Sequence, residues 1–266
     1  MYSRSSNRLL LLLALSLSTL LMIQSMNLRK AGNPNAIWNI VHQQCVPTMQ
    51  THGDPKPCAM VNIDNGVDKG FALLKDKRGR QQFLLIPTTP VTGIESKELL
   101  APDAINYFDA AWNARSFVEK NSPGNLTRSD YAMAINSMYS RSQSQLHIHV
   151  DCIRADVRDA LRQNEAAIKS DWSPLTVPLA GHTYMAMRVS GSQLGDNNPV
   201  KLMEKSLPGA STNMGAHTLV VIGTTFVDGT DGFILLADQA NRFIGYRAHG
   251  EDVQDHSCAV ATPRAP

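Results

Sequence analysis

Residues 136–153 read NSMYSRSQSQLHIHVDCI, and the second half of this stretch predicts a β-strand over Gln145–Ile153. Successive side chains of a strand point to opposite faces. One face is then apolar, formed by Leu146, Ile148, Val150 and Cys152. The other face is polar, formed by Gln145, His147, His149 and Asp151. Two interpretations of the polar face stay open, namely chance surface residues and a functional site built on two imidazoles.

The rest of the chain predicts an antiparallel sheet with flanking helices around this strand. Short apolar runs bounded by turn residues predict a hairpin of residues 71–74 and 83–86, and strands at 131–136, 183–189, 217–222, 232–237 and 242–247. Helical spacing of apolar residues predicts helices over 31–48, 97–120 and 154–172. Without an internal repeat or a long linker, residues 31–266 are expected to form one α+β domain.

Residues 1–30 have the features of an export signal. Arg4 and Arg8 precede an uncharged stretch at 9–26, LLLLLALSLSTLLMIQSM, whose 18 residues are close to the minimum that spans a bilayer. Its end has no clean small-residue cleavage motif. Both an uncleaved signal anchor, with a transmembrane helix at about 9–26, and a cleaved signal peptide therefore remain open. The positive flank predicts that residues 31–266 lie outside the cytoplasm.

The charge balance argues against a nucleic-acid-binding protein. The first thirty residues hold four of the 25 basic side chains and no acidic one, which leaves 21 basic against 23 acidic side chains in residues 31–266. Nucleic-acid binding needs clustered Lys and Arg to displace counterions. We therefore expect no nucleic-acid partner.

The four cysteines agree with export to an oxidising compartment. They can pair in three ways. Cys45 and Cys58 bracket a polar, Pro-rich loop, which favours a disulfide between them and leaves Cys152 to pair with Cys258.

Two kinds of chemistry suit the polar face of the strand. A metal site is one, but Asp151 lies ~13 Å along a strand from His147, so only neighbouring residues of this face can share an ion. Nucleophilic catalysis is the other. A neutral imidazole attacks phosphorus well when a neighbour holds one ring nitrogen protonated and the other nitrogen faces the substrate. The second chemistry requires no metal and no other cofactor.

The spacing of the polar residues resembles the histidine triad superfamily of nucleotide hydrolases and transferases. Its signature is His-φ-His-φ-His-φ-φ on a strand, where φ is apolar, with a Gln four residues before the first His and an Asn seven residues before that Gln. Gln143 and Asn136 stand at these positions relative to His147. This register makes His149 the central, nucleophilic histidine. An alternative register begins at Gln145 and makes His147 central, but it misses both spacings.

The resemblance also implies roles for the neighbouring residues. His147 is expected to position the substrate, and Ser144, which follows Gln143, is expected to contact the leaving group. Arg141 is expected to bind phosphate oxygens, because a guanidinium binds phosphate in a bidentate manner. Asp151 stands where the third histidine is expected, which puts that histidine's role in doubt.

Motifs in both halves of the chain narrow the resemblance to the bacterial CDP-diacylglycerol pyrophosphatase family. They are the N-terminal apolar segment, the cysteines around the Pro-rich loop, Ala134–Ser137, Leu146–His149, Cys152–Arg154, Gly181–His182 and Asp255–Cys258. The resemblance implies hydrolysis of CDP-diacylglycerol to CMP and phosphatidate, in phospholipid metabolism, by a single-pass inner-membrane protein with a periplasmic catalytic domain at the lipid surface. The alternatives are an exported enzyme acting on another nucleotide pyrophosphate and a non-catalytic module that binds a metal or a nucleotide.

Overall fold

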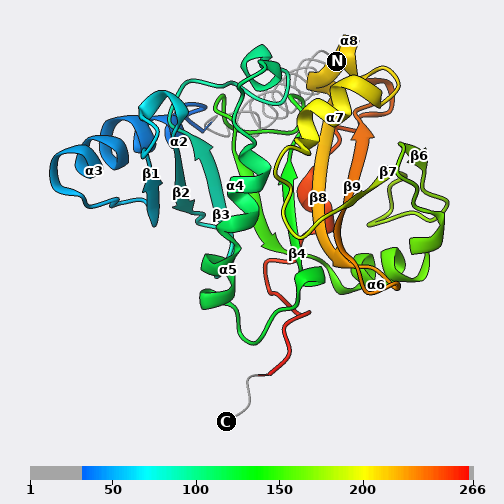
Figure 1. The fold of residues 1–266 in the computed structure, drawn as a ribbon. Coiled ribbons are helices and arrows are strands. Elements are labelled where there is room, and N and C mark those ends of the chain that lie inside the picture. Colours follow the sequence, from blue (N-terminus) through cyan, green and yellow to red (C-terminus); the bar gives the residue numbers. More distant parts are fainter. Residues whose placement is uncertain (1–31, 264–266) are drawn as a thin grey trace, which may run out of the picture. The chain divides into compact units, whose positions relative to one another are not determined.

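The computed structural model of the chain describes residues 32–263, and residues 34–263 belong to one compact unit. Within the described residues, the centre of the fold is a nine-stranded antiparallel sheet with the strand order β1-β2-β3-β5-β4-β8-β9-β7-β6 (Figure 1). The strands are β1 Met60–Asn62, β2 Phe71–Lys75, β3 Phe83–Pro87, β4 Tyr131–Ile135, β5 Ile148–Cys152, β6 Ser173–Pro174, β7 Met185–Ser190, β8 His217–Thr225 and β9 Asp231–Gln239. This arrangement confirms the α+β class and the predicted hairpin, which is β2 and β3.

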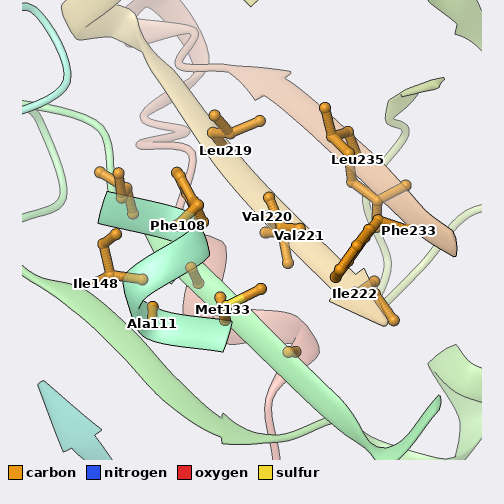
Figure 2. Packing of buried hydrophobic residues seen from close by; sticks show 14 of the residues in the cluster. Phe108, Ala111, Met133, Ile148, Leu219, Val220, Val221, Ile222, Phe233 and Leu235 are labelled. Atoms are coloured by element: carbon orange, nitrogen blue, oxygen red, sulfur yellow. The ribbon is translucent and has the colours of Figure 1, made fainter. Parts of the chain in front are cut away.

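The helices are short and pack on different parts of the sheet. They are α2 Ala36–Ile40, α3 Val46–His52, α4 Tyr107–Asn113, α5 Arg115–Asn121, α6 Ala155–Gln163, α7 Pro199–Ser206 and α8 Ala210–Asn213. Phe108 and Ala111 of α4 belong to the same buried cluster as Met133 of β4 and Ile148 of β5 (Figure 2). A second cluster joins the α2–α3 segment to β1, β2 and β3.

The two clusters identify the face on which the histidines lie. Phe83 and Leu85 of β3 belong to the cluster with α4, whereas Leu84 and Ile86 belong to the cluster with α2 and α3. His149 is paired with Leu84 across the β3–β5 ladder, and directly paired residues share a face. His149 therefore lies on the face that α2 and α3 cover.

The strand predicted over Gln145–Ile153 is shorter than expected, because β5 begins at Ile148. The Gln145 side chain accepts a hydrogen bond from Val91 N at 3.2 Å and donates one to the Thr89 carbonyl at 2.8 Å. Hydrogen bonds of the Gln145 side chain thus hold the segment before β5 in place, where the predicted strand would have used backbone hydrogen bonds to a neighbouring strand.

Three predicted helices have different limits. The helix predicted over 31–48 extends to His52, because a π-helical turn, Val41–Cys45, leads directly into α3, which holds Pro47 in its first turn. The helix predicted over 97–120 is divided at Pro102 into a 3₁₀ turn, Lys97–Leu100, and α4 and α5. The helix predicted over 154–172 ends at Gln163, where the side chain of Asn164 donates to the Ala160 carbonyl at 2.8 Å.

The strand predicted at 242–247 was wrong. The segment after β9 is a 3₁₀ turn, Arg242–Ile244, that ends at Gly245 with a φ of 74°. A positive φ favours glycine and reverses the chain direction instead of extending it. The exposed Phe243 and Ile244 thus belong to a turn outside the sheet.

The structure contains disulfides between Cys45 and Cys58 and between Cys152 and Cys258. The first connects the start of α3 to the segment before β1, and the second connects the end of β5 to the C-terminal segment. In residues 32–263, no helix has both the length and the apolar composition needed to cross a membrane. The predicted transmembrane segment at 9–26 lies outside the described residues.

Candidate active site

His147 and His149 line one cavity of about 420 Å³, which we call the histidine cavity. His149 lies on β5 between Leu84 of β3 and Ala134 of β4, and His147 immediately precedes β5. Their ring centroids are 4.9 Å apart. The remaining lining comes from α2, the β2–β3 loop and the segments after β4 and β9, namely Ala36, Ile37, Ile40, Leu74, Lys75, Asp76, Lys77, Arg78, Leu84, Asn136, Ser140, Ser142, Gln143, His249 and Glu251.

A carboxylate fixes the orientation of the His149 ring. Nδ1 of His149 lies 3.2 Å from Oε2 of Glu251, and Gln82 Nε2 donates to the same oxygen at 3.2 Å. Nε2 of Gln82 also lies 3.2 Å from Nδ1 of His149. We assign the ring proton to Nδ1, because the Gln82 amide donates to Glu251 and the carboxylate, which only accepts hydrogen bonds, also faces Nδ1. The lone pair then resides on Nε2, which lies 3.5 Å from Nδ2 of Asn136.

Burial keeps the His149 ring neutral. Its exposed fraction is 5%, and desolvation lowers the pKa of His149 to about 3 in spite of the nearby Glu251 charge. The His147 ring is held similarly, because its Nδ1 donates to the Gln145 carbonyl at 2.7 Å and burial lowers its pKa. Both imidazoles are therefore neutral bases at neutral pH, but only His149 is paired with a carboxylate.

Glu251 is the centre of a buried hydrogen-bond network. Besides Gln82, it accepts hydrogen bonds from Asn136 Nδ2 at 2.7 Å and from His249 Nε2 at 3.3 Å. Burial alone would raise the pKa of Glu251, but the hydrogen bonds with His249 and Asn136 outweigh it and hold this pKa well below its usual range. Glu251 is thus an ionised carboxylate beside a neutral imidazole.

His249 carries the charge that balances this carboxylate. Its Nδ1 lies 3.0 Å from Oδ1 of Asp252, and its Nε2 faces Glu251. These two hydrogen bonds raise the pKa of His249 to about 9. An imidazolium donates from both nitrogens, as this position requires.

The 3₁₀ turn Gly250–Val253, η8, brings Glu251 to His149. Gly250 N donates to Asn136 Oδ1 at 2.8 Å, and a Cβ atom on Gly250 would overlap with Oγ1 of Thr218 and approach Ala134. Only a glycine lets this turn lie so close to the sheet.

The structure brings some of the predicted site residues together and separates others. Asn136, Gln143, His147 and His149 line the histidine cavity. Arg141 lies outside this lining, with its guanidinium in a bidentate ion pair with Glu95 at 2.6 and 2.7 Å. The backbone N–H of Ser144 donates to the Pro34 carbonyl at 2.7 Å.

Asp151 lies outside the histidine cavity and is fully buried. Its carboxylate is 2.6 Å from Nδ1 of His256, and it also accepts from the backbone N–H of Cys152. Asp151, at the position expected for a third histidine, thus holds the C-terminal segment against β5 through His256.

Sequence reasoning missed Gln82, His249 and Glu251. Gln82 and Glu251 approach His149, and His249 pairs with Glu251, only because η8 and the residue before β3 pack beside the sheet. No fixed sequence spacing indicates such contacts. In the sequence, the tripeptide His249-Gly250-Glu251 places a His and an acidic residue on either side of a glycine, and this pattern could have identified two of the three residues.

Two further observations delimit the site. Within residues 32–263, no three His, Cys, Asp or Glu side chains are arranged to hold a metal ion. A larger cavity of about 580 Å³, between Thr127–Asp130, α6 and the end of β8, is lined by arginines, Asp130, Glu165, hydroxyl residues and apolar residues and contains no histidine. The histidine cavity is therefore the better candidate for nucleophilic chemistry.

Comparisons with known proteins agree over most of the chain. A family model described as CDP-diacylglycerol pyrophosphatase matches residues 32–262. The chain is also 42% identical over 229 residues to a Yersinia pestis protein named CDP-diacylglycerol pyrophosphatase, and the match covers 86% of each chain. The segment matched by the family model includes every residue of the Glu251 network.

Proposed function

The chain belongs to the CDP-diacylglycerol pyrophosphatase family, and we propose that it hydrolyses the pyrophosphate bond of CDP-diacylglycerol through a covalent nucleotidyl intermediate on His149. The products are CMP and phosphatidate. The main support for the role of His149 is its pairing with Glu251, which leaves Nε2 of His149 unprotonated. The ring lines a cavity of a size typical for small ligands.

The reaction has two displacements at the cytidine-side phosphorus. Nε2 of His149 attacks this phosphorus, and the bridging P–O bond breaks with its electron pair leaving on phosphatidate. A water oxygen then attacks the same phosphorus, the N–P bond breaks, and CMP leaves with the water oxygen. The imidazole recovers its lone pair, and the remaining proton goes to solvent.

Glu251 favours the first step electrostatically. The His149 ring is neutral before the attack and becomes cationic when the N–P bond forms, because Nδ1 keeps its proton. A buried carboxylate at 3.2 Å stabilises this developing charge. His249 keeps the carboxylate ionised and directed at Nδ1.

The lining of the histidine cavity suits a nucleoside pyrophosphate. Lys77 and Arg78, both exposed, supply positive charge at its edge, and Asn136 presents its amide beside Nε2 of His149. We assign substrate contacts to Asn136, Gln143, Ser144 and His147. Because Arg141 is paired with Glu95, we assign it the positioning of the loop at 140–144.

We also propose a histidine triad-like arrangement for the sheet around β5. The two histidines at alternate positions, the Asn and the Gln at the expected spacings, and the cavity in front of them support it. Asp151 departs from the triad and has a structural role through His256.

A membrane location suits the substrate. The apolar segment at 9–26 is the proposed inner-membrane anchor, with residues 31–266 as the periplasmic catalytic domain and phospholipid metabolism as its context. Ile37 and Ile40 of α2 line the histidine cavity, and nine residues of chain separate Met26 from Ala36, which puts these two residues at most ~35 Å apart when the chain is extended. A short tether of this kind holds the cavity near lipid headgroups.

Product analysis in isotopic water tests the proposal. The full chain in detergent micelles is given CDP-diacylglycerol in H₂¹⁸O, and the products are analysed by mass spectrometry. We expect CMP and phosphatidate, with the heavy oxygen in CMP only. Label in phosphatidate would mean attack on the lipid-side phosphorus and would overturn the proposed intermediate. Unchanged CDP-diacylglycerol, with turnover of another nucleotide pyrophosphate, would overturn the substrate.

A further inference from the structure

The turn that follows β9 exposes two large apolar side chains side by side. Phe243 is 102% exposed and Ile244 is 77% exposed, and both lie in the 3₁₀ turn Arg242–Ile244. We call residues 241–247 the apolar loop. Its ends are held together by hydrogen bonds between Asn241 and Tyr246, at 2.9 Å in both directions. The two apolar side chains therefore stand on a closed, structured turn.

The apolar loop borders the histidine cavity. The side chain of Ser137 donates to the Arg247 carbonyl, and the Ser137 N–H donates to the Ala248 carbonyl at 3.3 Å. The Arg242 guanidinium lies 5.2 Å from the ring centroid of Tyr139. Ser137 and Tyr139 belong to segment 136–140, and two other residues of this segment, Asn136 and Ser140, line the histidine cavity.

The strand directions place this loop at one end of the sheet. In the antiparallel order, the end of β9 lies at the same end as the end of β4 and the start of β5. In Figure 1 the β9 arrow points to the end of the sheet where α7 and α8 lie, away from α6. The chain also enters the described domain at this end, because the Pro34 carbonyl accepts a hydrogen bond from Ser144 N.

The charged side chains beside the apolar loop indicate which kind of surface the loop contacts. Arg242 and Arg247 are exposed on either side of Phe243 and Ile244. An apolar tip between two cations fits the interface of an anionic bilayer, where apolar side chains enter the acyl boundary and basic side chains meet the headgroups. Phe and Arg are also enriched in protein–protein interfaces, so the choice of a bilayer over a protein partner rests on the lipid nature of the proposed substrate.

We propose that Phe243 and Ile244 insert into the surface of an anionic phospholipid bilayer and hold the mouth of the histidine cavity against the lipid. This contact is separate from the N-terminal anchor. This inference rests on the proposed function, in which the substrate is a membrane lipid. The anchor limits the distance of the domain from the bilayer, and the loop sets its orientation.

A site-specific probe tests the insertion without requiring turnover. All four native cysteines form disulfides, so a single new thiol can be labelled in Phe243→Cys. The full chain is reconstituted into vesicles of phosphatidylethanolamine and phosphatidylglycerol, with an environment-sensitive dye on residue 243. The matched control is Val227→Cys, because Val227 is an 82% exposed apolar residue in the β8–β9 turn, at the opposite end of the same hairpin.

We expect the dye at residue 243 to shift to the blue and to lose emission to nitroxide-labelled lipids, and the dye at residue 227 to stay water-like. Equal, water-like emission from both positions would overturn the proposal and point to a protein partner. Failure of the wild-type chain to hydrolyse CDP-diacylglycerol would refute the proposed function but would leave this result intact.

A double variant tests the consequence for catalysis. In Phe243→Ser/Ile244→Ser, we expect turnover of CDP-diacylglycerol in vesicles to fall about tenfold, because the two apolar side chains proposed to enter the bilayer are lost. Turnover of a short-chain, monomerically dispersed analogue should remain at the wild-type level. An equal fall on both substrates would place the effect within the cavity and contradict a role in lipid contact.

Discussion

Oε2 of Glu251 lies 3.2 Å from Nδ1 of His149, although the two residues come from distant parts of the chain. Both side chains are buried on the face of the sheet covered by α2 and α3. The pair combines a neutral imidazole with an ionised carboxylate, and in the proposed mechanism Nε2 is the nucleophilic nitrogen.

Glu251→Gln should lower kcat by about a hundredfold with little change in KM, because the neutral amide no longer stabilises the cationic ring formed at the transition state. Steady-state kinetics with CDP-diacylglycerol in mixed micelles measure both constants. Glu165→Gln is the matched control, since Glu165 is a buried glutamate that accepts from Val227 N beside the other cavity. A near-native kcat in Glu251→Gln contradicts the electrostatic role.

His249 should make stability depend on pH. The folded-state pKa of His249 is raised from 6.5 to about 9, so its contribution is fully present below pH 6.5 and is lost as the pH rises through about 9. The free energy of unfolding of the native chain should therefore exceed that of His249→Gln most below pH 6.5, and the two should converge above pH 9. Denaturant titrations across this range measure it, and a difference independent of pH would exclude the charged pair.

Gly250→Ala should reduce kcat strongly while the sheet stays folded, because the new Cβ overlaps with Oγ1 of Thr218 and displaces Glu251. The double variant Gly250→Ala/Thr218→Ala removes this overlap and should regain part of the activity. Thr218→Ala alone is the control for the lost hydrogen bond to the Ile135 carbonyl. Purely additive effects in this double-mutant cycle would show that the two residues do not interact.

The two disulfides should differ in their functional effect. Cys152–Cys258 closes a loop with a sequence separation of 106, for which chain entropy gives about 4–5 kcal/mol, and it holds the segment with His256 against β5. Cys152→Ser/Cys258→Ser should lower both the free energy of unfolding and kcat. Cys45→Ser/Cys58→Ser should mainly lower stability, and a larger loss of kcat in this second variant would reverse the assignment.

The sequence predicts local features of this fold well and long-range contacts poorly. The alternation at 146–152 identifies β5 and its polar face because strand periodicity is a local property. The ends of elements are less predictable, since they depend on contacts such as the side-chain bonds of Gln145 with the loop after β3.

The network around Glu251 shows the same limit more clearly. Asn136 and His149 are related by a spacing that the sequence displays, and both line the histidine cavity. Glu251 and Gln82 reach His149 only because Gly250 lets η8 pack on the sheet and because β3 pairs with β5. The sequence predicted that Arg141 contacts phosphate, but its guanidinium pairs with Glu95 instead. Glu95 lies 46 residues away in the sequence, and no local pattern indicates such a contact.

Trapping the covalent intermediate tests whether His149 is the nucleophile. The native chain is mixed with CDP-diacylglycerol, denatured within one turnover at alkaline pH, where a phosphorus–imidazole bond survives, and mapped by peptide mass spectrometry. We predict a CMP adduct on His149, its formation in His147→Ala at a reduced rate, and its loss together with nearly all turnover in His149→Ala. An adduct on His147, or near-native kcat in His149→Ala, would contradict the account.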